Sequence, residues 1–134
     1  MTIHRQVNAT RGVLYAALLG IIVPLAGNGI ISIVSEAPLD FKNEWAVFLF
    51  QCIIIFLPFF LISAAGVSTL LSWTVGLVLT LSLWGYALAD ALLRRGTGTG
   101  ANIGLGLMVI ASPVVISVVC LAVGRYSVGR LGRG

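Results

Sequence analysis

The stretch that decides the fold runs from Trp45 to Leu93 and reads WAVFLFQCIIIFLPFFLISAAGVSTLLSWTVGLVLTLSLWGYALADALL. It holds a single formal charge, Asp90. A helix needs about 20 apolar residues to cross a hydrocarbon core about 30 Å thick, so this run is too long for one crossing and long enough for two. Small and hydroxyl residues interrupt it at 63–69, where Gly66 permits a turn. The stretch therefore predicts a transmembrane hairpin.

The composition of the whole chain indicates a membrane protein. Of its 134 residues, 59% are hydrophobic and 9% are charged, whereas soluble globular domains carry about 25% charged residues. The net charge of +4 is scattered along the chain, and a nucleic-acid-binding protein would gather its basic residues on one face. We expect the partners to include the lipid bilayer, with basic side chains meeting anionic lipids, and no nucleic acid.

Two further apolar runs flank the hairpin, so the sequence predicts an all-α, integral membrane four-helix bundle that forms one domain over residues 1–134. The predicted spans are 12–34, 45–65, 70–93 and 103–123, with short basic tails at 1–11 and 124–134. We expect both tails on the cytoplasmic side, because basic residues concentrate there. The tails carry Arg5, Arg11, Arg125, Arg130 and Arg133, and the loops carry Lys42, Arg94 and Arg95. The compact, loop-poor design favours a bacterial inner membrane.

Small residues recur at helical spacing in two of the predicted spans. Gly20 and Gly27 belong to such a stripe in the first span, and Ser72, Gly76 and Thr80 form one in the third. Residues three or four apart share a helix face. A face of small side chains allows a second backbone to approach closely, which is how helices associate in lipid. We predict that these residues are helix-packing positions.

Three prolines, Pro24, Pro58 and Pro113, lie near the centres of three spans. Because proline lacks a backbone donor, we expect the helices to kink or to be broken there. The effect should be strongest after Pro24, where Gly27 and Gly29 flank an asparagine. Prolines within a span are found at hinges and gates, and also in membrane helices without a moving part. The sequence leaves these two interpretations open.

Asn28 and Gln51 are the two side-chain amides within the predicted spans. Their distances from the span centres place both at ~6–8 Å from the midplane, in the same leaflet, at 1.5 Å per residue. Two adjacent antiparallel helices would bring the two amides to one level. One interpretation is a structural hydrogen bond between helices. The other is a polar intramembrane pocket in a broken helix, as in transporters.

Residues at the ends of the spans are expected to meet the membrane interface. Arg94 and Arg95 follow the third span, where both side chains can extend to headgroups or to a partner. Asp90 precedes Arg94 by four residues, the favourable order for an ion pair on a helix. Trp45 and Trp84 are expected to contribute to an aromatic belt at one interface.

The sequence offers no catalytic or metal-binding constellation. His4 is the single histidine and lies outside the spans, so a Ser-His-Asp triad is not available and we do not expect a zinc site. Cys52 lies early in the second span and Cys120 late in the fourth, so the two thiols should be too far apart to form a disulfide. We predict no cofactor.

We therefore interpret the chain as a non-enzymatic small integral membrane protein. It would be an accessory or structural subunit of a larger membrane complex, or a bundle that associates with further copies of itself. The alternative is a small oligomeric transporter or channel, using the proline-broken helices and the level of Asn28 and Gln51.

Overall fold

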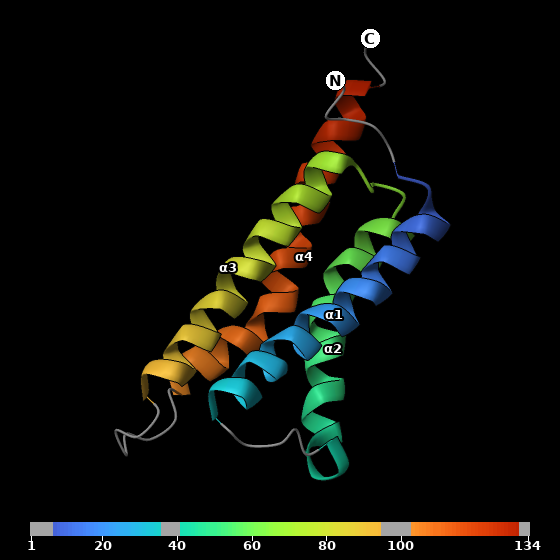
Figure 1. Cartoon of the computed structure of the whole chain (residues 1–134). Helices are drawn as coiled ribbons and strands as arrows, with labels where there is room; N and C mark the ends of the chain where they lie inside the picture. The colour runs from blue at the N-terminus through green and yellow to red at the C-terminus, as the bar shows by residue number, and fades with distance from the viewer. Residues whose placement is uncertain (1–6, 36–40, 95–102, 132–134) are drawn as a thin grey trace.

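The computed structural model describes residues 7–35, 41–94 and 103–131, which form four long helices in an up-and-down arrangement (Figure 1). They are α1 (Ala9–Ser35), α2 (Phe41–Ala64), α3 (Leu70–Arg94) and α4 (Ile103–Leu131). Each helix is long and apolar enough to cross a membrane. The prediction of an all-α chain with four candidate spans is confirmed at this level.

The helices form two antiparallel pairs, α1 with α2 and α3 with α4 (Figure 1). The contact between α2 and α4 joins the pairs, so α2 touches all three other helices. By comparison, α1 and α3 make few contacts with each other. The bundle is therefore held together around α2, and the space between α1 and α3 is not closed along its whole length.

The core draws on all four helices and is partly aromatic. Phe59 and Ile62 of α2 are fully buried and pack with Ile116 and Cys120 of α4. The ring of Phe59 stacks on that of Trp73, with 4.9 Å between the ring centroids. Eight buried side chains of the described residues are hydroxyls: Ser63, Ser68, Thr69, Ser72, Thr80, Ser112, Ser117 and Ser127. Such small polar residues allow close helix contacts where lipid supplies no hydrophobic drive.

One end of the bundle is closed around the turn between α2 and α3. Gly66 adopts a left-handed conformation with φ of 67°, which permits the tight reversal. Thr69 is the N-cap of α3. Its Oγ1 accepts a hydrogen bond from the Ser72 amide at 3.2 Å, which fixes the start of the helix. The amide of Val7 donates to the Ser68 carbonyl at 2.7 Å. The start of α1 is thereby attached to the turn.

The last helix continues beyond its predicted end. The sequence assigns residues 124–134 to a tail, yet α4 extends to Leu131. Gly124 packs directly on Val67 of the turn, and Ser127 is fully buried. On the outer face, the guanidinium of Arg130 lies 4.8 Å from the ring centroid of Tyr126, a cation–π contact. Packing on one face therefore keeps a glycine-rich and arginine-rich segment helical.

The prolines do not break their helices. Pro24, Pro58 and Pro113 lie inside continuous α1, α2 and α4, so the expected interruption after Pro24 is wrong. A proline removes only one backbone hydrogen bond, and a glycine in a helix costs about 1 kcal/mol relative to alanine. In addition, Asn28 Nδ2 donates to the carbonyl of Pro24 at 2.8 Å. These costs are small beside the packing of a 27-residue helix.

Candidate functional site: an interhelical cavity

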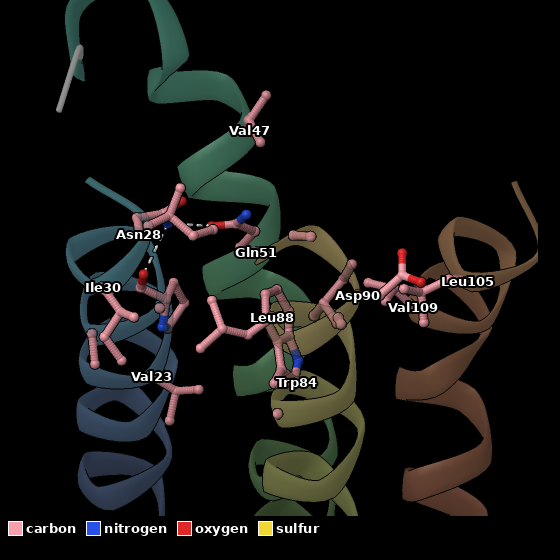
Figure 2. Close-up of a pocket in the computed structure, with 18 of the residues that line it drawn as sticks. Val23, Asn28, Ile30, Val47, Gln51, Trp84, Leu88, Asp90, Leu105 and Val109 are labelled. Atoms are coloured by element: carbon pink, nitrogen blue, oxygen red, sulfur yellow. Dashed lines mark hydrogen bonds between the residues drawn. The ribbon is translucent and has the colours of Figure 1, made fainter. Parts of the chain in front are cut away.

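The end of the bundle opposite the turn contains a cavity of about 890 Å³. All four helices line it, with residues 22–31 of α1, 47–54 of α2, 81–94 of α3 and 105–110 of α4 contributing side chains. Most of the lining is aliphatic, as Figure 2 shows for Val23, Ile30, Val47, Leu88 and Val109. The cavity exists because α1 and α3 stay apart here.

Asn28 and Gln51 meet at the cavity wall (Figure 2). Asn28 Nδ2 donates to Gln51 Oε1 at 2.7 Å, across the contact between α1 and α2. The same nitrogen donates to the Pro24 carbonyl, so both hydrogens of the Asn28 amide are used. In the part of the chain that the structure describes, Asn28 Oδ1 and Gln51 Nε2 have no hydrogen bond. The pair therefore presents a carbonyl and an amino group to the cavity.

Trp84 of α3 lines the cavity between the amide pair and Asp90 (Figure 2). Trp84, which the sequence pattern assigns to an interfacial belt, is half-buried in the cavity wall. Its indole N–H has no hydrogen-bond partner among the described residues. Trp73, in contrast, donates to Ser68 Oγ at 2.6 Å. No signal in the sequence separates these two tryptophans, because the difference depends on which helix faces each ring.

An ion pair stands at the rim of the cavity. Arg94 Nε lies 2.9 and 3.0 Å from the two carboxylate oxygens of Asp90, and both residues line the cavity. The pair joins residues i and i+4 of α3, as their spacing predicts. The carboxylate and the guanidinium neutralise each other, so these two residues together add no net charge to the cavity wall. Arg95 lies outside the described residues.

Glycines of two kinds occur in the helices, and they explain where the cavity lies. A Cβ added to Gly27, Gly85 or Gly106 would meet no atom within 4 Å, and all three line the cavity. A Cβ on Gly20 would lie 3.0 Å from Phe56 Cβ, and one on Gly76 would lie 2.8 Å from Cys120 Sγ. Gly20 and Gly76 lie at contacts between helices of this chain, whereas Gly27 makes no such contact and leaves space.

The other predicted packing residues lie at helix contacts. Ser72 and Thr80 are buried with Gly76 along one face of α3. Pro24, Pro58 and Pro113 are buried as well. Pro24 is the one of the three that lines the cavity. The cavity therefore brings together Asn28, Gln51, Gly27, Pro24 and Arg94, and leaves the α3 stripe and the other prolines elsewhere.

The described residues hold no group of three or more His, Cys, Asp and Glu side chains that could bind a metal ion. Cys52 and Cys120 are both free thiols. Of the residues that line the cavity, Asp90 alone has a carboxyl group, and Arg94 engages both of its oxygens. The arrangement is suited to binding a molecule that is mostly apolar and forms a few hydrogen bonds.

Comparison of the chain with protein-family models, with curated proteins and with solved structures finds no match.

Proposed function

We propose that the chain is a small non-enzymatic integral membrane protein that acts as an accessory subunit, binding another component of the membrane. It crosses the bilayer four times, with both termini on the cytoplasmic side of a bacterial inner membrane. The length and apolar character of the four helices support the crossings. The basic residues near the two ends of the chain support the orientation.

The observation that carries this proposal is the incomplete closure of the bundle. A self-sufficient four-helix bundle packs its helices around one continuous core, but here α1 and α3 leave a cavity of about 890 Å³. The cavity is lined by aliphatic side chains with an amide pair and an ion pair. A concave, mostly apolar surface with a few polar groups is the usual form of a binding site.

Purification from native membranes in mild detergent tests the proposal. We expect native mass spectrometry to detect a fixed stoichiometric companion of one of three classes: a second membrane protein, a further copy of this chain, or a bound small molecule. Catalytic turnover by the purified chain alone would contradict a non-enzymatic role. Recovery of the chain as a monomer without any bound protein or small molecule, in several mild detergents, would contradict the accessory role.

A small transporter or channel is the second candidate function. The observation that favours it is the position of the Asn28–Gln51 hydrogen bond in the cavity wall, since transporters place polar groups near the bilayer midplane. Solute or ion flux into proteoliposomes that contain the purified chain, abolished by Asn28→Leu, would support this candidate. Flux equal to that of protein-free liposomes would exclude it for the solutes tested.

A further inference from the structure

We propose that the cavity binds one lipid-soluble molecule with an apolar chain and an uncharged head that carries carbonyl oxygens. Esters of a neutral glycerolipid and the ring carbonyls of a quinone share this chemistry. The inference rests on the proposed membrane insertion, and it specifies what the accessory protein holds. Four features of the cavity carry it: its volume, its glycines, its unsatisfied polar atoms and its neutral rim.

The volume is that of a site for a small molecule. Sites for small molecules and cofactors measure about 300–1,000 Å³, and this cavity measures about 890 Å³.

Glycines give the cavity its width. Gly27 of α1, Gly85 of α3 and Gly106 of α4 face it from three helices, and a Cβ on any of them would meet only open space. Larger side chains at these positions would extend into the cavity without clashing with the protein. The glycines are therefore not required for helix packing, and their common effect is to leave room for an occupant.

Three polar groups of the wall have unused hydrogen-bonding capacity. Gln51 Nε2 and the indole nitrogen of Trp84 are donors without partners among the described residues, and Asn28 Oδ1 is an acceptor without one. A polar group without a partner is costly in hydrocarbon. Because N–H donors outnumber the acceptor, the best complement is a molecule that offers carbonyl oxygens.

The rim argues for an uncharged head. Among the described residues, the only charged ones that line the cavity are Asp90 and Arg94, and they pair with each other at 2.9 Å. A cationic or anionic head would have to compete for one member of this pair, or else remain without a counter-charge in an apolar space. An uncharged head with hydrogen-bond acceptors avoids both costs.

The test is to quantify the lipids that accompany the purified full chain. Wild type, Gly27→Leu and Gly29→Leu are isolated from the same native membranes in mild detergent and extracted with organic solvent for mass spectrometry. Gly29 also has open space for a Cβ but does not line the cavity, so it is the matched control. We expect about one neutral carbonyl-bearing molecule per chain in wild type and Gly29→Leu, and at least about tenfold less in Gly27→Leu.

A second pair of variants tests the hydrogen bonds. Trp84→Phe keeps an aromatic ring and removes the indole donor, whereas Trp45→Phe makes the same change at an exposed residue outside the cavity. Loss of one hydrogen bond should reduce retention by about 2- to 12-fold in Trp84→Phe. Retention by Trp45→Phe should equal that of wild type. If Gly27→Leu fails to fold, the comparison of Trp84→Phe with Trp45→Phe still tests whether the cavity binds the proposed molecule.

The extracted masses separate the possible sources and the contrary results. A glycerolipid and a quinone have different masses, and either would support the proposal. An extract that matches the bulk membrane and does not change in Gly27→Leu would overturn it, and so would a stoichiometric anionic phospholipid that is lost in Gly27→Leu and kept when Arg94 and Arg95 are replaced. A stoichiometric protein companion without a retained lipid would overturn the proposed ligand and leave the accessory role standing. Absence of any companion would overturn both.

Discussion

Gly76 of α3 and Cys120 of α4 approach so closely that a Cβ on Gly76 would lie 2.8 Å from the cysteine sulfur. The ring of Phe59 borders the same space, with Cε1 at 3.0 Å from that position. Nonbonded carbon atoms attract most strongly at about 3.5–4.0 Å and repel at shorter distances. The contact between α3 and α4 therefore depends on the absence of a side chain at residue 76.

Enlarging Gly76 should destabilise the bundle. We expect Gly76→Ala to lower the free energy of unfolding by about 1–3 kcal/mol through overpacking, and Gly76→Leu to prevent assembly. Thermal unfolding in detergent, followed by circular dichroism, measures the effect. Gly85→Ala on the same helix is the control, because its Cβ enters open space, and it should be neutral or stabilising. Equal melting temperatures for both alanine variants would contradict the contact.

The Asn28–Gln51 hydrogen bond should appear as coupling between the two residues. Asn28→Leu should cost about 0.6–2 kcal/mol, the range for hydrogen bonds between membrane helices. The double variant Asn28→Leu, Gln51→Leu should recover part of this loss, because it leaves no orphaned amide at that contact. A double-mutant cycle of unfolding free energies measures the coupling. Strictly additive losses would argue that each amide acts independently.

The buried hydroxyl of Thr80 should be dispensable. Its side chain is 2% exposed, and Oγ1 has no hydrogen-bond partner among the described residues. Thr80→Val keeps the shape and removes the unsatisfied group, so it should be neutral or raise the stability by about 1 kcal/mol. Ser72→Ala is the matched loss of a satisfied hydroxyl, which bonds the amide of Thr69 at 3.0 Å, and it should cost about 0.5–1.5 kcal/mol. If chemical or thermal unfolding showed Thr80→Val to be less stable than Ser72→Ala, the hydroxyl of Thr80 would not be the unsatisfied group.

Arg94 and Arg95 should matter more for retention of anionic lipid than for folding. An exposed ion pair between residues i and i+4 contributes about 0.3–0.5 kcal/mol, so Arg94→Ala, Arg95→Ala should leave the melting temperature nearly unchanged. Native mass spectrometry in the presence of an anionic phospholipid should show weaker retention than for wild type. Complete loss of folded protein would indicate that the arginines pair within the bundle.

The topology can be mapped with single cysteines. In a variant lacking Cys52 and Cys120, Thr10→Cys and Ala65→Cys introduce thiols at exposed positions at the closed end. A membrane-impermeant maleimide should label both from the cytoplasmic face of oriented vesicles and neither from the opposite face. Labelling of the two positions from different faces would overturn the number of crossings or their direction.

The sequence predicts the four helices well, because the run from Trp45 to Leu93 has too many apolar residues for one span and a glycine turn near its middle. It also places Asn28 and Gln51 at one depth, since the rise per residue is fixed by helix geometry, and the structure joins them at 2.7 Å.

The cavity was not predictable in the same way. Gly20 and Gly27 have the same sequence signature, yet the first touches Phe56 and the second faces open space. The distinction depends on how far α1 lies from α3, which local spacing does not determine. The helical end of α4 was missed for a similar reason, because the burial of Ser127 is a tertiary contact.

The bundle is closed at the end where Val7 bonds Ser68 and open at the end that holds the cavity. In a bilayer these two ends lie in opposite monolayers, so the protein would exchange molecules laterally with one monolayer only. In the proposed orientation, with the termini in the cytoplasm, that monolayer is the outer one of the membrane. The arginines on which this orientation is argued would then also decide which of two chemically distinct lipid pools the protein can sample.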